Sequence, residues 1–251
     1  MSQKRNVLII GCCGKMGQTV CRYLFSHTEY RPVAGVDVSR ANEDLGLMLG
    51  LGTTDILISD NLQKTLSEQN IDVAIDFTTP NTVVSNASVC LQNKVPVIIG
   101  TTGINSENIK MLELLSENTQ TPVLIVPNFA IGAVLMAEFA KKAAQYIKNV
   151  EIIELHHNQK IDKPSGTAIK TRQGILEAQN QTDKESDENY VPIHSIRLPG
   201  LVAHQEVIFG DVGQTLTIRH DSLNRDSFMP GISLALEQIK TAKGLEIGLK
   251  L

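Results

Sequence analysis

Short apolar runs that alternate with helical stretches dominate the first half of the chain, and they constrain its fold more than any other feature. The runs are apolar at almost every position, so their strands are expected to be buried on both faces, as in a parallel sheet covered by helices. Strands are predicted at 6–10, 33–37, 56–59, 72–77, 95–100 and 122–126, with helices between most of them, for example at 15–26, 80–92 and 105–117. This repeat predicts an α/β fold with a Rossmann-type, doubly wound parallel sheet.

The pattern changes after Phe129, which predicts a second domain of the α+β class. Its later strands alternate between apolar and polar residues, as in an antiparallel sheet with one face exposed to solvent or to a partner. The expected order is a helix at 131–147, a strand at 150–157, a helix at about 167–179, strands at 191–198, 204–210 and 214–221, and a helix at about 225–240. The polar segment 180–190 is expected to be a mobile surface loop. The predicted domains are 1–129 plus 225–251, which contains the nucleotide-binding sheet, and 130–224.

The composition argues against several classes of function. The formal net charge of the 251 residues is −4, so no overall positive field attracts nucleic acid or an anionic membrane. No apolar run approaches the roughly 20 residues of a membrane span, and the segment MSQKRNVLIIG has too few apolar residues for a signal peptide. The cysteines show neither CxxC spacing nor a disulfide framework, which predicts a cytoplasmic protein.

The segment VLIIGCCGKMGQTV places Gly11, Gly14 and Gly17 between a predicted strand and a predicted helix. Glycine there permits a tight turn, close approach of a diphosphate and close packing of the helix on the sheet. The N-terminus of the helix offers free N–H groups to phosphate. The position within a βαβ unit predicts a dinucleotide site, and the alternative is a plain tight turn.

Asp37 ends the second predicted strand, where a carboxylate would hold a ribose hydroxyl. A carboxylate repels a 2′-phosphate and so favours NADH, whereas the nearby Lys15 and Arg40 would tolerate that phosphate. NADH, with NADPH as a further donor, is therefore the expected cofactor. Cys12 and Cys13 are interpreted as small turn residues rather than redox thiols, although a helix N-terminus makes a thiol more sensitive to oxidation.

Small polar turns follow three more of the predicted strands: FTTP at 77–80, GTTG at 100–103 and VPNFAIG at 126–132. In a parallel sheet the carboxyl ends of the strands share one edge, where ligands bind. Threonine and glycine let the backbone approach a ribose or an amide. Each turn alone could be an ordinary helix cap, but together with the glycine loop they favour a cofactor groove.

The stretch ELHHNQKIDKPSGTAIK, residues 154–170, is the most unusual in the chain. His156 and His157 end a predicted strand and therefore point to opposite faces of the sheet. Lys160 follows, and 164–167 start a helix whose free N–H groups suit a carboxylate. A histidine there can deliver a proton near neutral pH.

This stretch has two other interpretations. One is an ordinary solvated loop that carries surface histidines. The other is a metal site, which is not predicted, because His156 and His157 are adjacent, no nearby Cys or Glu completes a recognised ligand spacing, and Lys160 would repel a cation.

The chain resembles the dihydrodipicolinate reductase (4-hydroxy-tetrahydrodipicolinate reductase) family nearly from end to end. The resemblance is carried by GCCGKMG, IDFTTP, GTTG, PNFAIGAVLM, ELHHNQKIDKPSGTA and RLPGLVAHQEVIFG with LTIRHDSLNRDSFMPG. It implies an oxidoreductase that uses NADH or NADPH to reduce a cyclic unsaturated dicarboxylate to tetrahydrodipicolinate, in diaminopimelate and lysine biosynthesis. It also implies a homotetramer built through sheets of the second domain.

The resemblance further implies roles for individual residues. His156 looks like the family's proton donor, and Lys160 looks like its partner in binding and polarising the substrate. The residues implied to hold the dicarboxylate are His157, Ser165, Gly166 and Thr167. The implied cofactor contacts are Gly11, Cys12, Cys13, Gly14, Lys15, Met16, Gly17, Gly100, Thr101, Thr102, Pro127, Asn128 and Phe129, with Asp37 on the adenosine ribose.

Some segments depart from the family pattern. The region 180–200 is shorter than in some members, and the tail GLEIGLKL lacks the aromatic-Asp-Met ending of others. The alternatives are another two-domain NAD(P) oxidoreductase, such as an amino-acid or homoserine dehydrogenase, and a catalytically silent dinucleotide sensor. Because the histidines are far in sequence from the glycine loop, hinges are predicted near 128–132 and 222–228, with closure on substrate.

Overall fold

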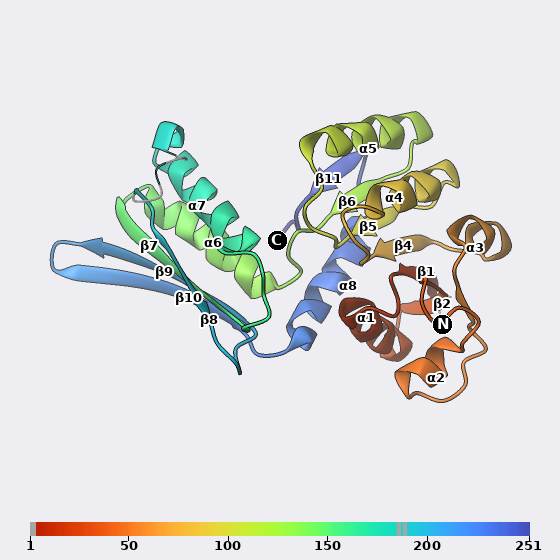
Figure 1. Cartoon of the computed structure of the whole chain (residues 1–251). Coiled ribbons are helices and arrows are strands. Elements are labelled where there is room, and N and C mark those ends of the chain that lie inside the picture. The colour runs from red at the N-terminus through yellow and green to blue at the C-terminus, as the bar shows by residue number, and fades with distance from the viewer. Residues whose placement is uncertain (1–3, 185–186, 188–189) are drawn as a thin grey trace. The chain divides into compact units, whose positions relative to one another are not determined.

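The computed structural model describes residues 4–184, 187 and 190–251 and divides into two compact units (Figure 1). The first unit comprises Met1–Phe129 and Met229–Lys250, and the second comprises Ala130–Phe228 with Leu251. Each unit has a hydrophobic core of its own.

The first unit is built on a seven-stranded sheet in the order β11-β6-β5-β4-β1-β2-β3, in which every neighbouring pair is parallel. The strands are β1 (Arg5–Ile10), β2 (Tyr30–Val36), β3 (Ile58–Ser59), β4 (Val73–Asp76), β5 (Val97–Ile99), β6 (Val123–Ile125) and β11 (Leu245–Ile247). The order from β3 to β6 is that of a dinucleotide-binding sheet, so the predicted fold class is confirmed. The edge strand β11 was not predicted.

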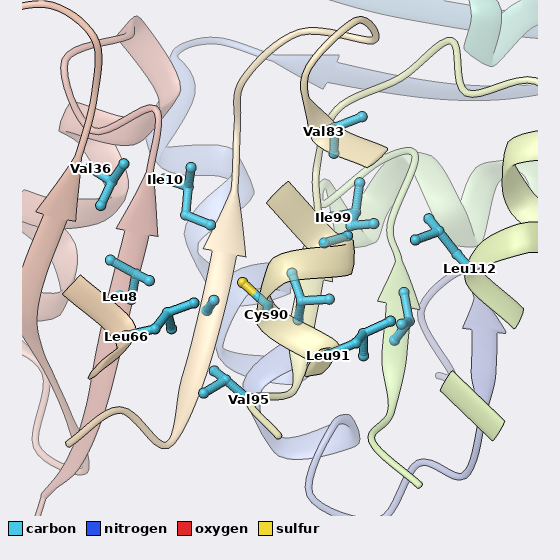
Figure 2. Close-up of a cluster of buried hydrophobic side chains, with 14 of the residues drawn as sticks. Leu8, Ile10, Val36, Leu66, Val83, Cys90, Leu91, Val95, Ile99 and Leu112 are labelled. Atoms are coloured by element: carbon cyan, nitrogen blue, oxygen red, sulfur yellow. The ribbon is translucent and has the colours of Figure 1, made fainter. Parts of the chain in front are cut away.

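The helices of the first unit are α1 (Lys15–Ser26), α2 (Leu45–Leu49), α3 (Leu62–Glu68), α4 (Val83–Gln92), α5 (Ser106–Thr119) and α8 (Met229–Gln238). Asparagine side chains cap two of them, since Asn61 accepts from the N–H of Lys64 and Asn105 accepts from that of Asn108. Figure 2 shows one core, where Cys90 and Leu91 of α4 lie among strand side chains such as Ile99. Both faces of the sheet are buried, which explains why the predicted strands are apolar throughout.

The second unit has a four-stranded sheet in the order β10-β9-β7-β8. Its elements are α6 (Ile131–Ala144), β7 (Asn149–His156), α7 (Gly166–Ala178), β8 (Ile193–Arg197), β9 (Ala203–Asp211) and β10 (Gln214–Ser222). Helices α6 and α7 cover one face of this sheet (Figure 1). The core between them and the sheet contains Met136, Ile175 and Phe209.

The prediction of an antiparallel second sheet was wrong for one pair. β9 runs antiparallel to β7 and to β10, but β8 runs parallel to β7. The chain leaves β7, forms α7 and returns as β8, and such a crossover places the two strands in the same direction.

Two short 3-10 helices complete the described chain, η1 (Thr182–Lys184) and η2 (Arg225–Phe228). The segment 180–190 was predicted to be mobile, and its residues 185–186 and 188–189 lie outside the described residues. The helix predicted at 225–240 begins as η2 and becomes α-helical at Met229. No helix in the described part of the chain is long and apolar enough to cross a bilayer.

Candidate functional site

The glycine loop joins β1 to α1 at the carboxyl edge of the first sheet. Gly11 has a φ of +81°, which L side chains rarely adopt. A Cβ on Gly17 would lie 2.1 Å from the carbonyl oxygen of Gly11, so α1 packs directly against the loop. Gly14 is the N-cap residue of α1, and glycine has no side chain that could cap the helix. The free N–H groups of this helix start are therefore available to an anion.

Asp37 follows β2 and holds the same loop in place. Its Oδ2 accepts from the N–H of Cys13 at 2.9 Å, and its Oδ1 accepts from the N–H and hydroxyl of Ser39 at 3.0 and 2.7 Å. The carboxylate therefore shapes the loop, and Oδ2 keeps a lone pair for a further donor such as a ribose hydroxyl.

The thiols beside Asp37 lie close enough together to be metal ligands, but their protonation disfavours a bound ion. Ligand atoms of Cys12, Cys13 and Asp37 lie within 4.8 Å of one another. Burial raises the pKa of both thiols, most strongly for Cys12, so they remain protonated near neutral pH, and a protonated thiol is a poor ligand.

The three turns predicted to share this edge do so, because β1, β4, β5 and β6 are neighbours in one parallel sheet. Phe77 and Phe129 bring their rings to 5.7 Å between centroids. Gly100 lies against both rings, and a Cβ there would be 2.3 Å from Phe77 and 3.0 Å from Phe129. Aromatic packing thus joins the turns that contain FTTP, GTTG and PNF.

A buried carboxylate joins two of these turns. Oδ1 of Asp76, at the end of β4, accepts from the N–H and hydroxyl of Thr78 at 2.8 and 2.6 Å and from the hydroxyl of Thr101 at 3.4 Å. Its Oδ2 accepts from the side-chain amide of Asn86 at 2.9 Å. Burial raises the pKa of Asp76 despite these donors. Asp76 was missed by the sequence prediction, although it directly precedes the FTTP turn.

The second group of candidate residues lies at the end of β7. Glu154 and His156 are two residues apart on one strand, so their side chains share the face that is covered by helices. The Glu154 side chain is 0% exposed, and its carboxylate forms a short hydrogen bond with Nδ1 of His156. Arg197, on β8, donates two hydrogen bonds of 2.7 and 2.8 Å to the same carboxylate.

The start of α7 is tied to this cluster. The N–H of Ser165 donates to Glu154 at 3.3 Å, and the Ser165 hydroxyl caps the helix by accepting from the N–H of Ala168 at 3.2 Å. Arg197 also donates to the carbonyl oxygen of Asp162 at 2.8 Å. The turn between β7 and α7 is therefore anchored at Asp162 and at Ser165.

Lys160 lies within this turn and forms an ion pair with Asp162 at 2.7 Å. Nδ1 of His157 is buried and has no hydrogen-bond partner among the described residues. Ammonium, imidazole and the N-terminus of α7 thus belong to one short segment. Such a cluster can bind a carboxylate and exchange a proton with a ligand.

The electrostatics of the cluster hold Glu154 ionised. Burial acts to raise the pKa of Glu154, but hydrogen bonds from Arg197 and His156 bring it below its ordinary value. Burial lowers the pKa of His156, the charges of Lys160 and Arg197 act in the same direction, and Glu154 opposes them. His156 is therefore neutral in the free protein near pH 7.

The structure places the candidate residues in two groups. His156, Lys160, Ser165 and Gly166 lie within one turn and the ends of the elements that it joins. The predicted cofactor residues lie at one edge of the first sheet. Their roles stay predictions.

Glu154 and Arg197 were not predicted from the sequence. The spacing of Glu154 from His156 was a usable signal, but the pairing of β7 with β8 was needed to find Arg197.

Two family profiles cover nearly the whole chain. The profile described as "Dihydrodipicolinate reductase, N-terminus" matches residues 5–129, and "Dihydrodipicolinate reductase, C-terminus" matches residues 132–250. The 4-hydroxy-tetrahydrodipicolinate reductase of Syntrophomonas wolfei is 44% identical, over 100% of this chain and 99% of the relative. The protein of the same name from Coxiella burnetii (strain Dugway 5J108-111) is 44% identical, over 98% of each chain.

Solved structures agree with this match. The structure described as "Dipicolinate bound Dihydrodipicolinate reductase" from Paenisporosarcina sp. TG-14 is 40% identical, with a TM-score of 0.82 over 98% of each chain. A probable dehydrogenase from Thermotoga maritima is 11% identical, with a TM-score of 0.68 over 97% of this chain and 91% of the other. The second comparison shows a likeness of fold alone.

Proposed function

Since the chain belongs to the dihydrodipicolinate reductase family, we propose that it reduces 4-hydroxy-tetrahydrodipicolinate to tetrahydrodipicolinate in diaminopimelate and lysine biosynthesis, with NADH or NADPH as the hydride donor. The observation that carries the proposal is the turn between β7 and α7. It brings Lys160 into one segment with His156 and a capped helix start, and the last two are hydrogen-bonded to one buried carboxylate. A cyclic dicarboxylate is the ligand class that such a cationic turn suits, and dipicolinate is bound in a related structure.

The edge of the first sheet fits a dinucleotide. The loop from Gly11 to Gly17 has no room for a Cβ at either end, and the helix that it starts offers free N–H groups. We assign the diphosphate to this loop, the adenosine ribose to Asp37, and the nicotinamide end to the turns at 100–102 and 127–129. A reduced nicotinamide, when bound, supplies the hydride.

The residues of the second unit would hold the substrate and supply the proton. Lys160 and the N-terminal N–H groups of α7 at Gly166 and Thr167 would bind carboxylate, with Ser165 and His157 beside them. The positive charge of Lys160 and the positive end of the α7 dipole would also stabilise negative charge that develops on the ring. His156 would deliver a proton to the ring, and a positioned general acid typically contributes about 10²- to 10⁴-fold in rate.

We further propose a homotetramer in the cytoplasm that needs no metal ion. The cysteines Cys12, Cys13, Cys21 and Cys90 are all free thiols, which agrees with a reducing compartment. The assembly would use the face of the second sheet that α6 and α7 leave open.

A coupled assay tests the proposed reaction. Pyruvate, aspartate semialdehyde and a synthase generate the unstable substrate, and loss of absorbance is followed separately for NADH and for NADPH. We expect turnover that depends on the synthase. Turnover with a linear amino acid or homoserine instead would identify a different dehydrogenase, and NADH binding without turnover would identify a sensor.

A further inference from the structure

We propose that Glu154, held in place by Arg197, is a positioning residue that fixes the Nδ1–H tautomer of His156 and makes Nε2 the nitrogen that delivers the proton. The inference rests on the proposed function, because it assigns a role within the proton transfer of that reaction. The family resemblance implied no role for Glu154 or Arg197.

The first observation is the isolation of the Glu154 carboxylate from solvent. Its side chain is 0% exposed. A buried charge is strongly unfavourable unless it is paired and hydrogen-bonded. Arg197 provides both, with Nη1 donating to Oε2 at 2.8 Å and Nη2 donating to Oε1 at 2.7 Å. This two-point contact also fixes the plane of the carboxylate.

The second observation is that Ser165 and His156 supply the other hydrogen bonds of the Glu154 carboxylate. Oε1 of Glu154 accepts from the N–H of Ser165 at 3.3 Å, and Oε2 forms the short bond with Nδ1 of His156. An ionised carboxylate can only accept hydrogen bonds. Nδ1 of His156 must therefore carry a hydrogen, which leaves Nε2 bare in the neutral imidazole.

The third observation concerns Nε2 itself. No hydrogen bond joins this atom to any residue in the part of the chain that the structure describes, while the His156 side chain is 14% exposed. Nε2 is thus the only ring nitrogen of His156 that can gain a proton and pass it to a ligand. Arg197 reinforces the arrangement, because its bond to the carbonyl oxygen of Asp162 fixes the turn that carries Lys160.

The charges that face His156 come from three elements. Glu154 lies on β7, Arg197 on β8, and Lys160 on the turn before α7, where it pairs with Asp162. Lys160 and Arg197 disfavour the imidazolium and Glu154 favours it. A doubly negative ligand near Lys160 would add negative charge, so we expect His156 to become protonated at Nε2 as the dicarboxylate binds.

The wild-type protein provides the first test, because it does not depend on a variant that folds. Nitrogen-15 NMR of the histidine rings, with His156 assigned by comparison with His156→Gln, reports the tautomer and the pKa. We expect the Nδ1–H tautomer in the free protein and a higher pKa for His156 when dipicolinate is added. An Nε2–H tautomer in the free protein would overturn the proposal.

The variant Glu154→Gln provides the second test. We expect kcat to fall about 10- to 100-fold with a smaller change in KM, since the loss is in proton transfer. Without the carboxylate the imidazolium is less stable, so the decline of kcat/KM with rising pH should move to lower pH. Glu177→Gln is the matched control, because Glu177 is an exposed glutamate of the same unit that pairs with Lys141 at 3.0 Å.

Two double variants separate positioning from folding. Glu154→Gln with Arg197→Gln removes both buried charges, so a folded protein with the same shifted pH profile supports the proposal. Glu154→Gln with His156→Ala should be no slower than His156→Ala alone, because Glu154 acts only through that ring. Losses that multiply, or an unshifted pH profile in Glu154→Gln, would refute positioning. If the wild type itself fails in the coupled assay, the proposed function fails, and the tautomer measurement remains a separate result.

Discussion

At the scale of single residues, Lys160 already has a partner before any ligand arrives. Its ion pair with Asp162 joins side chains that are 23% and 57% exposed. Pairs this exposed contribute only about 0–1 kcal/mol. A dicarboxylate that binds Lys160 can therefore displace Asp162, at a small energetic penalty.

We predict that Asp162→Asn binds the dicarboxylate more tightly than the wild type. Removing a competitor worth up to about 1 kcal/mol should lower KM up to roughly fivefold and leave kcat nearly unchanged. The measurement is KM in the coupled assay, supported by titration calorimetry with dipicolinate. Asp183→Asn, at an exposed position in η1, is the control. Weaker binding by Asp162→Asn would show that Asp162 holds Lys160 in its binding position.

The residues that sequence reasoning identified differ in kind from those it missed. His156 and Lys160 were found because titratable side chains gathered in one segment of the chain. Arg197 lies 43 residues from Glu154 in sequence, and the two meet only because β8 pairs with β7. No local pattern marks an arginine at the end of a strand as the partner of a distant glutamate.

At the scale of elements, Asp76 joins the ends of β4 and β5 and the helix α4. Because burial raises its pKa above the ordinary 3.8, the native state disfavours the ionised form. Its contribution to stability is fully present below pH 3.8 and is lost as the pH rises through the raised native pKa. We therefore predict that the wild type loses stability relative to Asp76→Asn as the pH rises from 3.8 through the raised native pKa of Asp76.

Urea denaturation at several pH values measures this difference for the first unit. Comparison with Asp76→Asn cancels the other titrating groups, so the slope of the difference with pH reports Asp76 alone. Asp72→Asn is a control at a carboxylate just before β4 that accepts from the N–H of Asn6. A difference that does not change with pH, or that favours the wild type as pH rises, would contradict a raised pKa at Asp76.

Two glycines within helices have opposite surroundings. A Cβ on Gly231, in α8, would lie 1.9 Å from the carbonyl oxygen of Phe129, whereas a Cβ on Gly174, in α7, would meet only a Lys141 side-chain carbon at 3.8 Å. We predict that Gly231→Ala destabilises the protein by about 1–3 kcal/mol and weakens dinucleotide binding, since it displaces the 127–129 turn. Gly174→Ala should stabilise by about 0.5–1 kcal/mol. Thermal unfolding and an NADH titration compare the pair, and equal effects would argue against the packing of α8 on this turn.

The elements of the first sheet were predictable because burial on both faces leaves a continuous apolar run in the sequence. The direction of β8 was not predictable, since apolar alternation is the same in parallel and antiparallel strands. Strand β11 was missed because three residues, Leu245–Ile247, carry too little pattern. Pairing with β6, which comes from a distant part of the chain, defines it as a strand.

At the scale of the whole molecule, the chain passes between its two units at Phe129–Ala130 and Phe228–Met229. The first crossing lies inside the hinge predicted near 128–132, and the second adjoins the hinge predicted near 222–228. The hinges stay predictions. Closure on substrate would be measured by small-angle scattering with and without NADH and dipicolinate.

We propose that the tetramer assembles through one surface of the second unit. Alternation along the strands directs Ile153 and Leu155 of β7, Ile196 of β8 and Ile208 of β9 to the face without helices. All four side chains are half-buried. Ion pairs lie on the same face, where Arg219 contacts Glu206 at 2.8 Å and Asp221 at 3.0 Å, and His204 contacts Asp221 at 2.7 Å. An apolar strip beside charged pairs is the composition expected of an interface between identical subunits.

We predict that the wild type has four times the 27.4 kDa mass of the chain in light scattering after gel filtration, and that Ile208→Lys dissociates it. In a symmetric assembly the new ammonium would be buried in each copy of the interface without a partner, which is strongly unfavourable. Leu114→Lys, at a position on α5 that is 61% exposed, should leave the mass unchanged. A tetramer that survives Ile208→Lys would place the interface elsewhere, and a wild-type monomer at all concentrations would remove the open face as an assembly surface.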